Sequence, residues 1–86
     1  MNTKEVKEGE VYRHFKGPFY YVMCVALDSE TRERMVVYRH LDGTGIICVR
    51  SEKMFLEEIP ERPDNVTGQK VRFELIENLK DYNCEK

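Results

Sequence analysis

The sequence predicts a mainly all-β protein, a small SH3-like, partly open barrel. We expect a four-strand antiparallel meander, one helical turn and one or two closing strands. Two patterns predict it: short runs of aromatic and β-branched residues separated by turn residues, and a change of apolar period after Arg50. The third observation is length, because 86 residues bury only about 60–65% of their unfolded surface, which suits one compact barrel.

The first two strands follow a charged start. Residues 1–8 are rich in charge and predict a flexible arm, before a single domain at 9–76 and a polar tail at 77–86. Within the domain, Val11 to Phe15 alternates in polarity, and Lys16-Gly17-Pro18 reads as a turn. Phe19 to Leu27 is apolar on both faces, as expected of a central strand.

The next hairpin follows a polar connector at 28–33. Arg34 to His40 predicts the third strand and Ile46 to Arg50 the fourth. Between them, Asp42-Gly43 is a strong hairpin signal, because a type I′ turn needs positive φ at both central residues.

The period then changes. Ser51 fits the N-cap of a helical turn that runs through Phe55, because its hydroxyl can accept from an exposed backbone N–H. Leu56 to Ile59 predicts a short fifth strand, residues 60–68 a loop, and Val71 to Ile76 a closing strand.

A short echo marks the first and third strands. Residues 11–17 (VYRHFKG) and 37–43 (VYRHLDG) match at five of seven positions. In a meander the two stretches should lie at similar heights, about 9.5–10 Å apart, with the second strand between them. Arg13 and Arg39 would share one face of the sheet. The other face would carry the tyrosines and histidines of the echo: Tyr12, His14, Tyr38 and His40.

The echo has two interpretations. Strand packing and hairpin chemistry alone explain it, since Val and Tyr favour strands and Arg and His tolerate half-exposed positions. Alternatively, Arg13, Arg39 and Arg50 converge on an anionic ligand, because the planar guanidinium binds carboxylate or phosphate in a bidentate way. Neighbouring rings would then supply a stacking wall, from Tyr12, His14, Tyr20, Tyr38 and His40.

Several of these motifs occur in a known order. The chain resembles the bacterial family called domain of unknown function 1653 over residues 9–59, through YRHFKG (12–17), SET (29–31), VVYR (36–39), VR (49–50) and MF (54–55). The resemblance implies a bacterial or phage cytosolic protein without a known activity. The family usually has Trp at position 48, Tyr at 42 and Pro at 51, where this chain has Cys48, Asp42 and Ser51. If Trp and Tyr form a stacking surface in relatives, this chain has lost much of it.

Charge and cysteine spacing argue against several classes. The net charge of −2 and a pI near 5.7 disfavour a dedicated nucleic-acid binder, without removing nucleic acid as a ligand. No CxxC pair is present, so neither a zinc ribbon nor a disulfide framework is predicted. The charged start MNTKEVKEGE resembles no signal peptide, and FYYVMCVAL (19–27) is too short for a membrane helix. We expect a cytoplasmic protein with reduced thiols and no membrane partner.

Catalysis is not expected. Cys24 or Cys48 with His14 or His40 is the one conceivable nucleophile pair, but both cysteines lie inside apolar strands, where Cys is normally a small core residue. No ligand spacing supports a metal, and no cofactor motif is present.

Two functions remain in view. The first is a non-catalytic binding module whose Arg/Tyr face takes an anionic ligand: a nucleotide, a nucleic-acid segment or an acidic peptide. The second is a protein-protein interaction domain, or a self-association domain that forms a homodimer. It rests on the apolar character of both faces of the second and fourth strands.

Overall fold

The computed structural model describes residues 5–79 and has five strands and one short helix. Their bounds are β1 Glu10–His14, β2 Phe19–Leu27, β3 Arg34–His40, β4 Ile47–Ser51, α1 Glu52–Phe55 and β5 Phe73–Asn78. The predicted meander, helical turn and closing strand are therefore confirmed. β2 and β3 have the predicted bounds, whereas the ends of β1, β4 and β5 are shifted by one or two residues.

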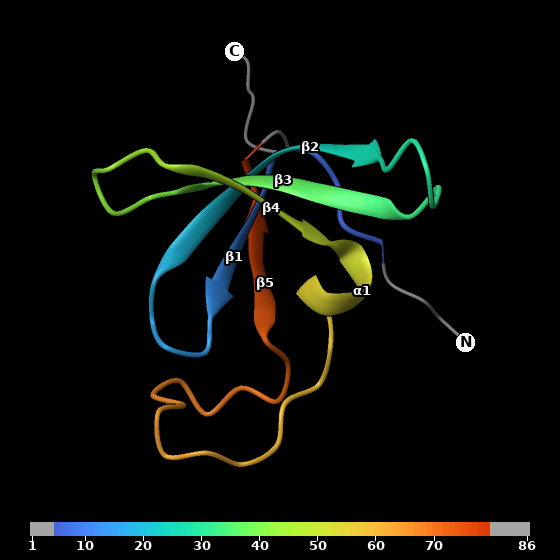
Figure 1. Cartoon of the computed structure of the whole chain (residues 1–86). Helices are drawn as coiled ribbons and strands as arrows, with labels where there is room; N and C mark the ends of the chain where they lie inside the picture. The colour runs from blue at the N-terminus through green and yellow to red at the C-terminus, as the bar shows by residue number, and fades with distance from the viewer. Residues whose placement is uncertain (1–4, 80–86) are drawn as a thin grey trace.

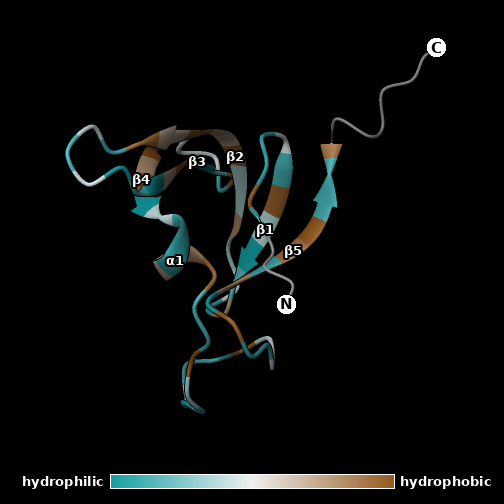
Figure 2. Ribbon diagram, turned by 90° about the vertical axis from the view of Figure 1, so that its right-hand side faces the viewer, coloured by the Kyte–Doolittle hydropathy of each residue, from teal (hydrophilic) through white to brown (hydrophobic). Residues whose placement is uncertain are grey.

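All five strands form one antiparallel sheet in the order β4-β3-β2-β1-β5. Figure 1 shows β3 and β4 crossing over the upper ends of β1 and β5, with α1 directly after β4. In Figure 2, β4 and α1 lie on one side of the molecule and β1 and β5 on the other. The sheet is thus curled, with its two edge strands apart, which is consistent with a partly open barrel.

The register corrects the predicted height of the echo. Tyr12 pairs with Tyr20, and Tyr20 pairs with His40, so the second copy is offset from the first by two residues along the strands. The lengths of the turns between the strands set this offset, and a repeat in the sequence does not constrain them. An offset of two residues keeps each side chain on its face, because side chains alternate with period two. Arg13 and Arg39 therefore do share a face, as predicted.

The turn between β3 and β4 is not the predicted type I′ hairpin. Gly43 and Gly45 have φ of 97° and 66°, but among the described residues the one non-glycine with positive φ is Arg32. Asp42 instead accepts hydrogen bonds from the backbone N–H of Thr44 at 2.9 Å and from its hydroxyl at 2.7 Å. These local bonds stabilise a wider turn, because an Asp side chain competes with the backbone for donors.

The helical turn begins where the sequence places it. Ser51 has extended backbone angles, and its hydroxyl accepts from the N–H of Met54 at 3.2 Å, as an N-cap does. The predicted fifth strand is reduced to a bridge between Glu58 and Val71. The loop that follows passes beneath β1 and β5 in Figure 1 and returns to β5.

The core is unusually aromatic and lies on one face of the sheet, which we call the inner face. Phe55 from α1 and Phe73 from β5 stack with ring centroids 4.0 Å apart and planes 4° apart. Tyrosine rings from β1, β2 and β3 meet this pair or one another edge-on. The buried residues of the cluster are Val6, Tyr12, Tyr20, Val22, Val36, Tyr38, Phe55 and Phe73.

The chain before β1 takes part in this core. Val6 is 1% exposed, its N–H donates to Glu52 at 2.8 Å, and its carbonyl accepts from Arg34 at 3.2 Å. Residues 5–8 therefore differ from the predicted flexible arm, because one apolar side chain suffices to anchor the segment over α1. Residues 1–4 of that arm, and residues 80–86 of the predicted tail, lie outside the described residues.

Within residues 5–79 no helix is long and apolar enough to span a membrane.

The stack predicts a large difference between neighbouring residues of α1. Phe55→Ala should lower the free energy of unfolding by about 3–5 kcal/mol, because it removes a fully buried ring from the centre of the core. Met54→Ala, at a half-exposed side chain one position earlier, should change it by less than about 1 kcal/mol. Urea unfolding followed by circular dichroism measures both. Equal losses in the two variants would contradict a core centred on this ring.

Candidate functional site

The predicted site residues divide between the two faces of the sheet. Strand pairing places Arg13 and Arg39 on the outer face, whereas Arg50 pairs with buried Val36 and lies on the inner face. The predicted convergence of the three arginines does not occur. The tyrosines and histidines of the echo all belong to the inner face, with Arg50: Tyr12, His14, Tyr38 and His40.

The two outer-face arginines are held by neighbouring turns. Arg13 Nε donates to the carbonyl of Gly17 at 3.1 Å, and its guanidinium lies 5.1 Å from the ring centre of Phe19. Arg39 is exposed and lies over the next turn, where a Cβ on Gly45 would be 3.2 Å from its guanidinium. Arg13 thus stabilises its own hairpin, whereas Arg39 packs over the turn that follows it.

Two of the predicted site tyrosines belong to the core. Tyr12 is fully buried, and its hydroxyl donates to Glu10 at 2.8 Å. Burial, and then this bond to the carboxylate, raises the pKa of Tyr12. Tyr38 is 5% exposed and packs edge-on to Phe55. Both rings are packed in the core, and neither offers an exposed surface on which a ligand could stack.

His14 lies among aromatic rings and cations. Its ring stacks on Phe15 at 4.3 Å and meets Phe73 edge-on at 4.9 Å. Its Nδ1 accepts from the N–H of Lys16 at 3.1 Å. Burial first, and then the positive charges of nearby side chains, lower the pKa of His14 from 6.5 to about 4; these charges belong to Arg72, Lys16, Arg50 and Arg62. This part of the inner face is therefore electropositive around a neutral imidazole.

Arg50 is the cation that the inner face leaves without a counter-ion. Its guanidinium is half-buried, lies 5.7 Å from the ring centre of Phe73, and donates through Nε to the Tyr38 hydroxyl at 3.4 Å. Across residues 5–79, no carboxylate lies within ion-pair distance of it. Three other half-buried arginines have such partners: Arg34 with Glu52, Arg62 with Asp64, and Arg72 with Glu57.

A second group on the inner face contains Cys48. Its Sγ lies 3.5 Å from Nε2 of His40, and Nδ1 of His40 lies 3.7 Å from the carboxylate of Asp42. The ring of Tyr20 packs edge-on against His40 at 4.7 Å. Cys24, by contrast, is exposed on the outer face, which corrects its expected place in the core.

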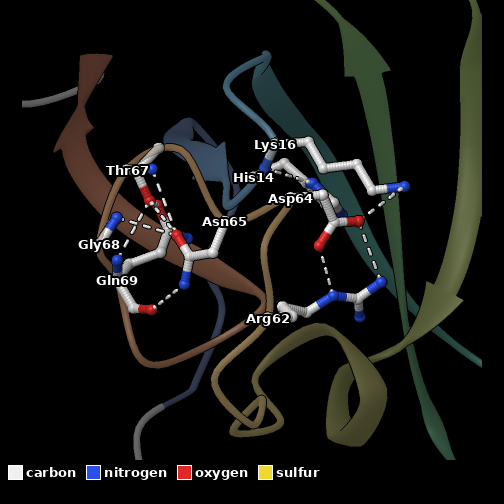
Figure 3. A network of polar contacts seen from close by, with 8 residues as sticks. All are labelled: His14, Lys16, Arg62, Asp64, Asn65, Thr67, Gly68 and Gln69. Atoms are coloured by element: carbon white, nitrogen blue, oxygen red, sulfur yellow. Dashed lines mark hydrogen bonds and ion pairs between the residues drawn. The ribbon is translucent and has the colours of Figure 1, made fainter.

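The loop after α1 contributes residues that the sequence did not single out. Arg62 binds both carboxylate oxygens of Asp64, at 2.6 and 3.1 Å, and its guanidinium lies 4.7 Å from the ring centre of Phe15. Lys16 reaches the same carboxylate at 3.7 Å (Figure 3). The Arg-Pro-Asp spacing at 62–64 was the available signal for this clamp.

Gln69 fastens the loop to the sheet. It is buried, and its amide nitrogen donates to three main-chain carbonyls, those of Arg13 at 2.8 Å, Val71 at 3.0 Å and Arg72 at 3.2 Å. Thr67 donates to its amide oxygen at 2.6 Å, and Asn65 closes the turn around it (Figure 3). An open groove of about 620 Å³ lies beside it, with opposite charges mixed along its walls: Glu58, Glu61, Arg62 and Lys70.

Comparison with known proteins now supplies the family. The model for proteins of unknown function DUF1653 matches residues 10–75. The chain belongs to this family. No curated protein and no solved structure gives a significant match.

In this DUF1653 domain, the inner face carries the unpaired guanidinium of Arg50, the neutral imidazole of His14 and the thiol of Cys48. A half-buried guanidinium without a carboxylate can bind phosphate or carboxylate strongly, since charge-assisted bonds are about twice as strong as neutral ones. No three side chains of His, Cys, Asp or Glu gather as metal ligands within the described part of the DUF1653 domain.

The His14 environment predicts an acid-sensitive fold. Because the folded pKa of His14, about 4, lies below its ordinary 6.5, the unfolded chain takes up the proton first as pH falls. The free energy of unfolding should therefore decrease between about pH 6.5 and 4, by about 1 kcal/mol once solvent screening is allowed for. His14→Gln should flatten this dependence. NMR titration should place the midpoint of His14 near pH 4, and a midpoint above 6 would contradict the described environment.

Proposed function

We propose that this DUF1653 domain is a non-catalytic binding module that takes an anionic group at Arg50 on the inner face. The observation that carries the proposal is that the neighbouring half-buried arginines form ion pairs with carboxylates, whereas Arg50 does not. Arg62 and Arg72 are neutralised by Asp64 and Glu57, while Arg50 meets a phenol and a phenyl ring. Leaving a half-buried charge without a counter-ion costs stability, so a site of this kind favours an incoming anion.

The surroundings of Arg50 support a ligand that combines a negative charge with a flat apolar part. Arg50 projects from an edge strand, with Cys48 two residues earlier on the same face. The histidine rings of His14 and His40 are partly exposed on this face. A nucleotide has this combination, whereas a long nucleic acid is disfavoured by the net charge of −2. An acidic peptide is the remaining ligand class.

The same proposal includes a compartment. The module would work in the cytosol, where Cys24 and Cys48 would stay reduced as the free thiols that they are in the structure.

A pair of arginine variants tests the site. Arg50→Gln should raise the dissociation constant of a nucleoside triphosphate about tenfold or more, because it removes a charge-assisted bond. Arg39→Gln, on the outer face of the same sheet, should leave it unchanged. Amide NMR titration at low salt measures both, and the wild-type shifts should cluster at Arg50 and its neighbours and weaken as salt rises.

The outcomes separate the site from general charge effects. If the two variants lose affinity equally, attraction by net charge explains the binding. If no nucleotide, short oligonucleotide or acidic peptide shifts the inner-face amides, the proposal is wrong.

A second candidate function is self-association through β4. The outer face of this edge strand carries Ile47 and Val49, which are 55% and 59% exposed. An unpaired strand edge can pair with the same strand of a second copy, and the apolar side chains would then be covered. We therefore propose that this surface is the interface of a homodimer.

Sedimentation at increasing protein concentration tests the dimer. Val49→Lys should shift the protein towards the monomer, because it places a charge in the proposed contact. Leu27→Lys, at a similarly exposed apolar side chain at the end of the central strand β2, is the matched control. A wild-type protein that stays monomeric at the highest concentration would exclude this function.

A further inference from the structure

The thiol of Cys48 occupies a position that packing alone does not explain. Cys48 is half-buried on the inner face of β4, where it packs against the edge of the core. Its sulfur nevertheless points to a ring nitrogen, at 3.5 Å from Nε2 of His40. A buried structural thiol usually has only apolar neighbours, whereas reactive thiols lie partly exposed beside a base.

His40 is oriented from both sides. Its Nδ1 lies 3.7 Å from the carboxylate of Asp42, so the two nitrogens face an acid and a thiol. A carboxylate beside Nδ1 favours the tautomer that carries its proton there, which leaves Nε2 free to accept from the thiol. The ring of Tyr20, packed edge-on at 4.7 Å, restricts the imidazole to this orientation.

Asp42 is itself held in place. One carboxylate oxygen accepts from the N–H and the hydroxyl of Thr44, and the other is the oxygen nearest His40. Hydrogen bonds from Thr44, the largest cause, keep the pKa of Asp42 below its usual value, so the carboxylate is charged at neutral pH. The hydrogen bonds that stabilise the wide turn between β3 and β4 thus also hold the Asp42 carboxylate toward His40.

The other charged and titratable groups around the thiol come from three strands. They are Tyr20 of β2, Tyr38 and His40 of β3, and Arg50 of β4, with Asp42 in the turn; the charges of Tyr38, Asp42, Cys48 and Arg50 all act on Tyr20. Arg50 lies on the same face as Cys48, two residues along β4. A cation on the same face favours developing negative charge on the sulfur.

We propose that Cys48 is a reactive thiol that His40 and Asp42 prepare for exchange with low-molecular-weight disulfides. The Cys48 proton passes to Nε2 of His40, and Sγ attacks one sulfur of the disulfide. A new S–S bond forms as the old one breaks. The leaving thiolate takes the proton back from Nε2, so the products are a mixed disulfide at Cys48 and one free small thiol.

This modification site goes beyond ligand binding at Arg50 and does not depend on it. It needs only the geometry of Cys48, His40 and Asp42. Cys24 provides an internal comparison, because it is more exposed than Cys48 but has no histidine beside it in the described structure. Exposure alone predicts that Cys24 reacts faster, whereas the proposal predicts the reverse order.

Single-cysteine variants of the full chain measure the order. Cys24→Ser with Cys84→Ser leaves only Cys48, and Cys48→Ser with Cys84→Ser leaves only Cys24. Each is mixed with oxidised glutathione at pH 7, and mixed-disulfide formation is followed by mass spectrometry. Cys48 should react about tenfold faster than Cys24, which is less than the hundredfold or more that is typical of general-base assistance in enzymes.

Two further substitutions in the Cys48-only protein test the mechanism. His40→Gln should reduce the rate to that of Cys24. Asp42→Asn should do the same while keeping the bonds from Thr44, because its amide would face Nδ1 and move the ring proton to Nε2. In both variants the pH profile of the rate should become that of the Cys24-only protein, a change that loss of packing alone would not produce.

Circular dichroism controls for folding, and Asp42→Asn decides alone if His40→Gln does not fold. A fast Cys48 that slows in the variants supports the proposal. A Cys48 that reacts no faster than Cys24, or whose rate is unchanged by Asp42→Asn, overturns it. Either result leaves the nucleotide titration of Arg50→Gln to be judged separately.

Discussion

The stack of Phe55 on Phe73 is the contact on which the rest of the structure depends. It joins α1, which follows one edge strand, to β5, which is the other edge strand. An open sheet of five strands would leave its inner face in water. Because the two rings lie together at 4.0 Å, the sheet curls around them and the tyrosines of the meander pack against their edges. Such edge-on contacts add stability beyond the area they bury.

The same stack explains where the free charge lies. Phe73 forms the floor beneath Arg50 and the edge contact of His14, so a cation and a neutral imidazole are held over one ring. Most of the aromatic residues predicted to stack on a ligand are instead packed in the core. What remains for a ligand is the polar rim of that core, which is why Arg50 and not Arg13 or Arg39 carries the proposed site.

Local signals in the sequence were sufficient for the meander, the helical turn and the shared face of Arg13 and Arg39, but not for the face of Arg50. Alternation placed Arg13 with Arg39 correctly, and Ser51 was predicted as a cap, because period and capping depend on a few neighbouring residues. The offset of the echo, the burial of Val6 and the bond from Gln69 to the carbonyl of Arg13 were not predictable in this way. Each depends on how far a turn carries the chain, or on a partner distant in sequence, and one sequence contains neither distance.

The two sides of β4 show how one edge strand can support separate functions. Its side chains alternate: Ile47 and Val49 point outward, while Cys48 and Arg50 point to the inner face. Because β4 has a neighbour on one side only, both sets stay partly accessible. A second copy paired along the outer surface would cover the apolar set and leave the polar set at the rim of the core. Self-association and chemistry at the inner face therefore make no competing demand on the same side chains, and a single strand with period two satisfies both.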